Sequence, residues 1–300
     1  MAVLANRRAI NEVNGFAVLS FTASVESGAP TMVVIRILIF ALAFVLSVGA
    51  SANDALTLEG AAGGAHRSAS NIGRNAWRHP VETLTFFGLN SDMTVVEIWP
   101  GGGGWYTEVL APYLRDNGKL YAANYDGSTG REYFKRNAEK FKNKLAEQPD
   151  VYDRVAITAL MPPASMEPAP AGSVDMVVSF RNLHNWVRDG IDGPMLKAIY
   201  DLLKPGGILG LVAHRGNPDM NGIEWARKGY VPEAEAIRIA EAAGFTFAGR
   251  SEINANPNDT KDYADGVWTL PPSFRLGETD KATYEAIGES DRMTLKFARH

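Results

Sequence analysis

The sequence predicts an α/β fold: a doubly wound, mostly parallel seven-stranded sheet with helices on both faces, preceded by an N-terminal helical cap. From Leu89 onward, short runs rich in β-branched residues alternate with longer amphipathic segments, which is the pattern of a parallel sheet flanked by helices. The stretch LLKPGGILGLV reads as a helix end, a proline-glycine stop and a strand that is apolar throughout, as a strand covered on both faces should be. With 300 residues and 46% hydrophobic content, the chain can bury one large core or two modest ones.

The β-branched runs place seven strands, at 94–99, 119–124, 154–159, 174–180, 207–213, 245–253 and 293–299. Between the second and third, REYFKRNAEKFKNKLAEQP carries its large apolar side chains largely on one helical face. The proline-rich stretch 161–172 predicts a loop, because proline can neither donate to a ladder nor sit inside a helix.

Residues 53–93 precede the first strand and form the predicted cap segment. The stretch HRSASNIGRNAWRHPVETLTFFGL combines three arginines, two histidines and a tryptophan. It is too polar for a core and too aromatic for a plain linker, so we expect a helical cap over the domain at 94–300.

Residues 32–52 resemble a secretory signal peptide. One arginine precedes about a dozen apolar residues, and Ala50, Ser51 and Ala52 supply small residues where a signal peptidase cleaves. The mature chain is then predicted to begin at Asn53, exported to the periplasm and without a permanent membrane span; the alternative is a membrane tether formed by an uncleaved signal. Residues 1–31 give this signal an unusually long leader, which indicates an upstream extension from a wrong start and translation from Met32.

Composition narrows the range of ligands. The formal charge of −4 and pI near 5.8 provide no global basic field, so no nucleic-acid partner is expected and a small-molecule substrate is. The absence of cysteine excludes disulfides, thiolate metal sites and cysteine nucleophiles. The spacing of the five histidines is not that of metal ligands, so no metal site is predicted. The sequence contains no G-x-S-x-G motif, which weakens a hydrolase interpretation.

The stretch VVEIWPGGGGWYTE places a glycine turn between a strand and a helix. A strand that ends with an acidic residue, followed by such a turn, brings backbone N–H groups and a helix N-terminus beside a polar ligand. The glycines let the ligand approach the backbone closely. By itself the pattern is shared by many doubly wound proteins.

The glycine turn, together with LYAANYD, VDMVVSFRNLHNW and LLKPGGILGLV, resembles the class I S-adenosylmethionine-dependent methyltransferases over roughly residues 80–300. More narrowly, FRNLHNW, SEINANP, GVWTLPP and GESDRMTLKF resemble a bacterial group of exported predicted methyltransferases. The resemblance implies a Rossmann-like methyltransferase fold with S-adenosyl-L-methionine as cofactor. It also implies that the final strand, 293–299, is antiparallel and inserted near the sixth.

By the same resemblance, Glu97 orients the methionine end of the cofactor, Pro100, Gly101 and Gly103 form the turn, and Asp126 holds the ribose hydroxyls. Two positions depart from the family. Trp99 stands where the first glycine of the family pattern would stand, and AITALMPP lacks the acidic residue that often meets the adenine. We expect Trp99 to form a wall of a working ligand site; the alternative is a tight turn with a core tryptophan.

Polar residues follow the fourth, fifth and sixth strands, where ligands of doubly wound sheets bind. Arg181, Asn182 and His184 are the candidate catalytic residues, with His184 as a general base or as a residue that fixes the loop. Arginines bind carboxylate and phosphate bidentately, so one interpretation is an anionic substrate; the alternative is that these arginines pair with carboxylates to hold the cap. The candidate substrate-binding residues are Arg67, Arg78, His214, Arg215 and Glu252.

Two functions remain open from the sequence. The first is an S-adenosylmethionine-dependent methyltransferase that acts on an unknown small molecule by in-line methyl transfer. The second is an exported, non-catalytic binding protein that keeps the fold, since fold does not fix function.

Overall fold

The structure, a computed structural model, describes residues 56–129 and 131–300. The predicted upstream extension and signal peptide lie outside these residues. Within the described part of the chain, no helix has both the length and the apolar character needed to cross a membrane.

The centre of the fold is one sheet with strand order β3-β2-β1-β4-β5-β8-β7, and the two-residue β6 pairs with β5. The strands β1 to β5 pair in parallel, whereas β8 runs antiparallel between β5 and β7. The predicted fold class and the inserted antiparallel strand are therefore confirmed. The strands are β1 (Thr94–Ile98), β2 (Lys119–Asn124), β3 (Ala156–Ala159), β4 (Val174–Phe180), β5 (Leu203–Gly216), β6 (Val231–Pro232), β7 (Thr246–Ser251) and β8 (Arg292–Ala298).

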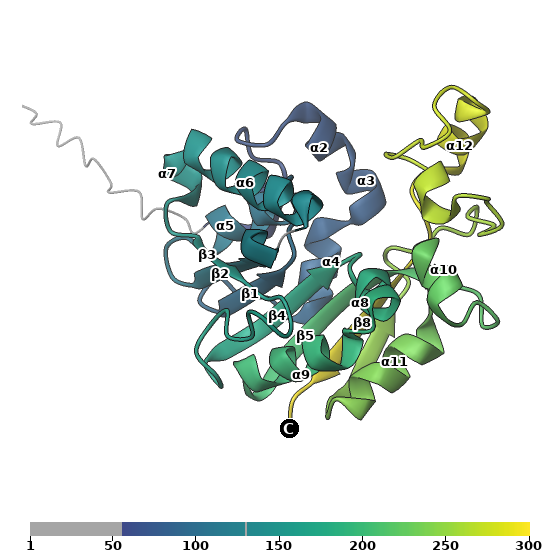
Figure 1. The fold of residues 1–300 in the computed structure, drawn as a ribbon. Helices are drawn as coiled ribbons and strands as arrows, with labels where there is room; N and C mark the ends of the chain where they lie inside the picture. Colours follow the sequence, from purple (N-terminus) through teal and green to yellow (C-terminus); the bar gives the residue numbers. More distant parts are fainter. Residues whose placement is uncertain (1–55, 130) are drawn as a thin grey trace, which may run out of the picture. The chain divides into compact units, whose positions relative to one another are not determined.

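Helices cover both faces of this sheet (Figure 1). The α-helices are α1 (Leu58–Ala62), α2 (Ala69–Gly73), α3 (Asn75–Arg78), α4 (Pro80–Phe87), α5 (Thr107–Leu114), α6 (Glu132–Glu147), α7 (Pro149–Tyr152), α8 (Leu183–Asp189), α9 (Asp192–Leu202), α10 (Ile223–Arg227), α11 (Glu233–Ala242) and α12 (Lys281–Ile287). Two 3-10 helices, η1 (Gly127–Thr129) and η2 (Gly266–Thr269), lie in connecting segments.

Alternating side chains of each central strand enter two separate cores. On β1, Val95 packs with α1, α4 and α5, while Val96 packs on the opposite face with α8, α9 and α11. On β4, Met176 and Val177 divide in the same way. Both faces are buried because successive strand side chains point in opposite directions, which explains why these strands are apolar throughout.

The segment before β1 is helical, as predicted, but part of it belongs to the core. Leu84 and Phe87 of α4 are one helical turn apart and pack against the sheet. The Phe87 ring lies so close to β5 that a Cβ built on Gly210 would be 2.4 Å from it, so this position requires glycine. The expectation that this stretch is too polar for a core therefore does not hold for α4, because two apolar residues on one helix face suffice to bury it.

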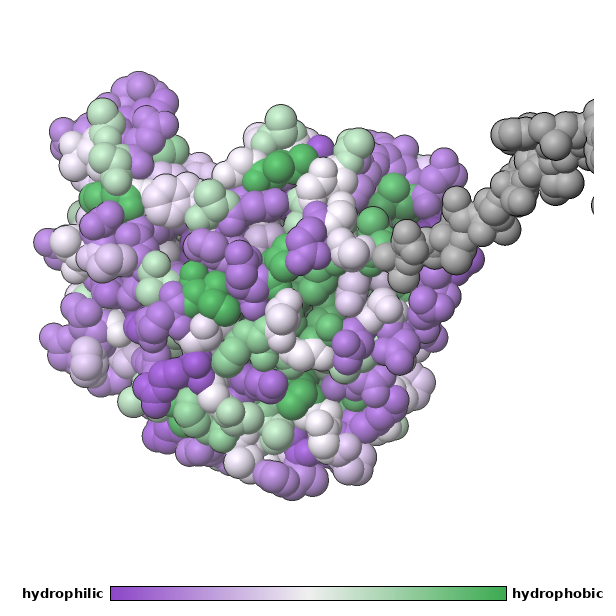
Figure 2. Space-filling model, turned by 180° about the vertical axis from the view of Figure 1, so that it is seen from behind, coloured by the Kyte–Doolittle hydropathy of each residue, from purple (hydrophilic) through white to green (hydrophobic). Residues whose placement is uncertain are grey.

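The connection between β7 and β8 carries η2 and α12 and projects from the sheet beside the cap helices α2 and α3 (Figure 1). The side chain of Trp77 in α3 fills the space beside Gly288, at the end of this connection. Seen from behind, the surface is mostly hydrophilic, with hydrophobic residues in small separate patches (Figure 2).

Candidate functional site

A cavity of about 210 Å³ lies at the carboxyl ends of β1 and β4. These strands are neighbours, but the chain leaves β1 towards α5 on one face and leaves β4 towards α8 on the other. Such a switch point is where doubly wound proteins bind ligands, because no connection covers it. The cavity is lined by Glu97, Ile98, Trp99, Pro100, Gly101, Trp105, Tyr106, Tyr125, Tyr133, Phe180, Arg181, Asn182, His184, Asn185, His214 and Trp268.

The glycine turn joins β1 to α5 and forms one edge of the cavity. Gly101 and Gly104 have φ angles of 70° and 54°, in the left-handed region that favours glycine. The N–H of Gly104 donates to the Pro100 carbonyl at 3.2 Å and closes the turn. A Cβ on Gly101 or Gly103 would meet nothing within 4 Å, so the backbone there is open to an approaching group. Of the two predicted glycines, Gly101 lines the cavity.

Glu97 is buried at the end of β1, and its carboxyl group accepts a hydrogen bond of 2.6 Å from the Thr107 hydroxyl. Burial raises the pKa of Glu97 to about 7, against the opposing effects of Thr107, Lys144 and Arg181. Near neutral pH the group is divided between its acid and its carboxylate form. It can therefore donate to a neutral ligand or accept from a cationic one.

Trp99 lies across the carboxyl ends of β2 and β3. Its φ angle of 49° turns the residue out of the strand, and its indole N–H donates to the Leu160 carbonyl at 2.7 Å. The ring is buried, with its centroid 4.9 Å from that of Tyr125 and 6.2 Å from that of Phe134. It thus both lines the cavity and fills the space beside the second and third strands.

Asp126 follows β2 but does not line the cavity. One of its carboxylate oxygens accepts from the N–H and hydroxyl of Ser128, and the other accepts from Ser165 at 2.6 Å. The hydrogen bonds to Ser128 and Ser165 lower its pKa. The structure brings Glu97, Trp99, Arg181 and His184 together around the cavity, whereas Asp126, which the resemblance assigns to the ribose, lies outside the cavity lining.

The residues at this cavity fit S-adenosylmethionine in part. Glu97 and the open backbone of the glycine turn suit the amino acid end of the cofactor. The adenosine end fits less well, because the indole of Trp99 occupies the ends of β2 and β3. The cavity of about 210 Å³ is also below the range of about 300–1,000 Å³ that is usual for small-molecule pockets.

The segment after β4 forms the opposite edge of the cavity. Asn182 is buried, and its amide donates to the Ile98 carbonyl at 2.9 Å and to the Ser179 hydroxyl at 3.3 Å. It thereby ties the ends of β1 and β4 together. Arg181 has a φ angle of 63°, and its side chain has no hydrogen bond or ion pair to any other residue in the described ranges.

His184 and His214 lie side by side, with ring centroids 5.5 Å apart and Trp268 against both. Neither ring nitrogen of His184 has a partner among the described residues, whereas His214 contacts the Ser290 hydroxyl through Nδ1 at 2.6 Å. Burial, with the nearby Arg188 and Arg181, lowers the pKa of His184 to about 3; burial also lowers the pKa of His214. Both imidazoles are neutral at pH 7, and a base of such low pKa is a weak proton acceptor.

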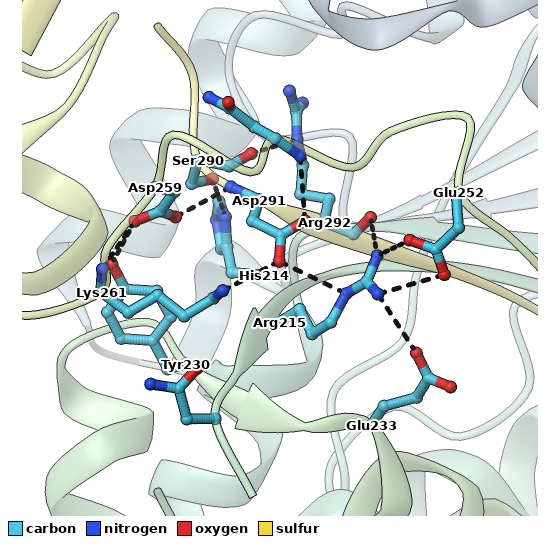
Figure 3. A network of polar contacts seen from close by, with 12 residues as sticks. His214, Arg215, Tyr230, Glu233, Glu252, Asp259, Lys261, Ser290, Asp291 and Arg292 are labelled. Atoms are coloured by element: carbon cyan, nitrogen blue, oxygen red, sulfur yellow. Dashed lines mark hydrogen bonds and ion pairs between the residues drawn. The ribbon is translucent and has the colours of Figure 1, made fainter. Parts of the chain in front are cut away.

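The other predicted substrate-binding residues lie away from the cavity lining. Arg67 pairs with Glu108 at 3.1 Å, and Arg78 pairs with Glu289 at 3.3 Å behind the cavity wall. Arg215 pairs with Glu252 at 2.6 Å and with Asp291 at 3.4 Å (Figure 3). His214 alone of the five lines the cavity. Arg67, Arg78 and Arg215 therefore have carboxylate partners within the chain, as the alternative interpretation expected.

A second cavity, of about 410 Å³, lies beside Arg215 and is bordered by Glu233 and Lys261. Arg215 and Lys261 both contact Asp291, and Arg215 also faces Glu233 at 3.8 Å (Figure 3). The positive charges at this cavity are thus balanced by neighbouring carboxylates. Among residues 56–129 and 131–300, no group of three histidine or carboxylate side chains is placed to hold a metal ion.

Several site residues were not predicted from the sequence. Tyr106 stacks on Phe180 with centroids 3.4 Å apart and, with Trp105 and Trp268, gives the cavity aromatic walls. Behind them, Glu289 pairs with several arginines. A signal was present: Trp268 lies in GVWTLPP and Glu289 in GESDRMTLKF, two of the stretches that carry the narrower resemblance.

No protein-family model matches the sequence, and no curated protein matches it. Among solved structures, a SAM-dependent methyltransferase from Aquifex aeolicus is 16% identical with a TM-score of 0.51, covering 76% of this chain and 93% of that one. Geranyl diphosphate C-methyltransferase from Streptomyces coelicolor A3(2), with S-adenosyl-L-homocysteine bound, is 14% identical with a TM-score of 0.51, covering 80% and 87%. The cyclase SpnF is 15% identical with a TM-score of 0.53, covering 79% and 85%.

These similarities show that the chain has the fold of class I methyltransferases. At this level of identity they show the fold alone, and the presence of a cyclase among the three is consistent with one fold hosting several activities. The narrower resemblance to an exported bacterial group stays a prediction.

Proposed function

We propose that the protein is an S-adenosylmethionine-dependent methyltransferase that acts on a small molecule. The observation that carries this proposal is the cavity at the switch point. One edge of it is Glu97 with the glycine turn, and the other is the polar segment after β4. The structural similarity to methyltransferases supports the same assignment.

In this proposal the amino acid end of the cofactor lies against Glu97 and the backbone of Gly101. When bound, the cofactor supplies an electrophilic methyl group on a sulfonium. The ammonium of the cofactor favours the carboxylate form of Glu97. Because Glu97 is partly protonated near pH 7, binding of the cofactor releases this proton.

The acceptor lies on the other side, against His184, Asn185 and Trp268. The neutral ring of His184 has two nitrogens without partners among the described residues, so it can orient an acceptor hydroxyl or amine by hydrogen bonding. The aromatic walls exclude water from the acceptor. Most of the catalysis then comes from holding the nucleophile in line and near attack distance.

Trp99 controls whether the adenosine end of the cofactor can bind. Its indole must leave the ends of β2 and β3 for the nucleoside to lie there, and the hydrogen bond to Leu160 is lost in that movement. The same position favours a second candidate function, in which the protein binds a smaller ligand and has lost methyl transfer. Both proposals include the export that residues 32–52 predict. Because S-adenosylmethionine is a cytoplasmic cofactor, export favours the second function over methyl transfer.

Titration of the purified protein with S-adenosylmethionine and S-adenosylhomocysteine separates the two functions. The methyltransferase proposal expects calorimetric binding to the unmodified protein, weakened by Glu97→Ala. If Trp99→Ala binds S-adenosylhomocysteine and the unmodified protein does not, Trp99 closes the nucleoside site and the second function is favoured. Because Trp99 is buried, circular dichroism must first show that the variant is folded. Asp126→Ala tests the assignment of Asp126 to the ribose: it weakens binding only if Asp126 turns towards the ribose in the complex.

A further inference from the structure

One wall of the cavity is backed by an arginine cluster, which we define as Arg74, Arg78, Arg181 and Arg292. Three of these residues share the carboxylate of Glu289, at 2.7 Å for Arg74, 3.3 Å for Arg78 and 3.1 Å for Arg292. Burial by itself raises the pKa of Glu289, but the three guanidiniums outweigh it and hold the pKa at about 2. Glu289 is therefore fully ionised, yet it carries one negative charge against three positive ones.

Arg181 adds a fourth positive charge that no carboxylate within the described ranges pairs with. It is close enough to Glu289, Arg292 and Arg74 for their charges to act on its pKa, but it forms no ion pair with Glu289. Burial lowers the pKa of Arg181 to about 10, so the guanidinium stays charged at neutral pH. Its Nε atom is buried and has no hydrogen-bond partner in the described part of the chain.

Glu289 does not balance the positive charge of the arginine cluster, and guanidinium nitrogens of the cluster also lack hydrogen-bond acceptors among the described residues. Nη2 of Arg74 and Nη1 of Arg78 are also buried without partners among the described residues. The hydroxyl of Tyr106 does not serve them, because it donates to the Arg78 carbonyl at 3.0 Å. Buried cations without partners destabilise a fold, so an arrangement of this kind is expected where a ligand supplies the missing charge.

Arg181 is the member of the cluster that lines the cavity. Beside it lie His184, with both ring nitrogens unpartnered in the described residues, and the aromatic rings of Tyr106, Phe180 and Trp268. The cavity thus offers a cationic donor at one point and apolar walls around it. This combination selects a small molecule with an oxyanion on an otherwise apolar body.

We propose that Arg181 binds the carboxylate or phosphate of a small acceptor molecule, with Arg78 and Arg292 supplying positive potential behind it. This proposal rests on the proposed function, because it concerns the acceptor side of the same cavity. Two molecules can supply an oxyanion to Arg181: the acceptor, and the cofactor through its carboxylate. The assignment is to the acceptor, because Arg181 lies with His184 and His214 on the β4 side.

The test uses benzoate as the anionic probe and benzamide as its neutral counterpart, with the thermal midpoint of the full chain followed by circular dichroism. Benzoate is expected to raise the midpoint of the unmodified protein, and benzamide to bind at least tenfold more weakly. Arg181→Gln is expected to lose at least tenfold in benzoate affinity, whereas Arg181→Lys retains part of it. Arg250→Gln is the matched control, because Arg250 pairs with Glu233 away from the cavity.

A second readout guards against misfolding. Arg181→Gln removes a buried charge without a partner, so its midpoint in the absence of ligand is expected to be higher than that of the unmodified protein. A structural arginine would give a lower midpoint. The proposal is overturned if benzoate stabilises Arg181→Gln as much as the unmodified protein, or if neither is stabilised by benzoate or by inorganic phosphate.

Two further titrations separate this proposal from the proposed function. If Arg181→Gln weakens the binding of S-adenosylhomocysteine but not the binding of 5′-methylthioadenosine or benzoate, Arg181 holds the cofactor carboxylate and the acceptor assignment is wrong. If no nucleoside binds but benzoate binding depends on Arg181, methyl transfer is refuted and the anion site stands.

Discussion

The hydroxyl of Thr107, at the start of α5, donates to the buried carboxyl group of Glu97 at the end of β1 over 2.6 Å. This contact joins the strand and the helix on either side of the glycine turn. The hydrogen bond lowers the pKa of Glu97, but burial has the larger effect and raises the pKa to about 7. A carboxyl group in this state makes both stability and ligand binding depend on pH.

The stability of the protein should fall as pH rises from about 4.5 to 7. In this window the folded state holds a proton on Glu97 that the unfolded chain has released, so raising the pH favours unfolding. A shift from 4.5 to about 7 corresponds to a loss of about 3 kcal/mol at roughly 1.4 kcal/mol per unit. Urea unfolding at pH 5, 6, 7 and 8 should show this decline, and Glu97→Gln should remove it. Glu252→Gln, at an exposed position, should follow the unmodified protein; a parallel decline in Glu97→Gln would assign the effect to another group.

Binding of S-adenosylhomocysteine at pH 6.5 should release protons from Glu97. The group is mostly protonated before binding, and the ligand ammonium lowers its pKa in the complex. Calorimetry in two buffers of different ionisation enthalpy measures this release. We expect it to vanish in Glu97→Gln and to shrink at pH 8.5. Proton uptake in place of release would show that the ammonium does not lie against Glu97.

Glu289→Gln should destabilise the protein by about 3–5 kcal/mol, the usual cost of removing one partner from a buried charge pair. Three arginines lose their carboxylate in this variant. Denaturant unfolding at pH 7 measures the loss, and Glu235→Gln, whose partner Arg238 is exposed, should cost less than about 1 kcal/mol. Because the pKa of Glu289 is lowered to about 2, its contribution should persist down to pH 5 and disappear as the pH falls from about 4.5 towards 2.

Asn182→Ala should cost about 1–3 kcal/mol of stability, because the Ile98 carbonyl loses its buried donor. Asn185→Ala is the control: it lines the same cavity, and its side chain makes no hydrogen bond to the described residues, so its effect should lie within about 0.5 kcal/mol. Equal effects of the two variants in chemical denaturation would mean that the tie between β1 and β4 does not stabilise the fold.

The order of elements follows from local patterns in the sequence. The apolar run from Val174 to Phe180 and the alternation of such runs with amphipathic segments predict buried parallel strands. The structure extends β5 to Leu203–Gly216, beyond the predicted 207–213, because pairing with β4 at one end and with β6 at the other continues past the apolar run. The two-residue β6 was not predicted, since a segment so short leaves no periodic pattern.

The candidate site divides in a similar way. Residues at the end of a strand or shortly after it, such as Glu97, Trp99, Arg181 and His184, could be placed at one edge of the sheet from the sequence. Asp126 follows a strand as well, but contacts with Ser128 and Ser165 occupy its carboxylate. A pattern along the chain specifies where a side chain starts and not what it contacts.

The sequence by itself determined the sheet, its switch point and the glycine turn, because backbone periodicity and glycine conformations are local properties. Only the tertiary structure decided which charges meet. Arg78 and Glu289 are 211 residues apart in the chain, and their contact depends on how the cap and the β7–β8 connection close over the sheet. Whether Arg181 has a partner, and whether the indole of Trp99 covers the ends of β2 and β3, depends on packing among distant segments, which no local pattern specifies.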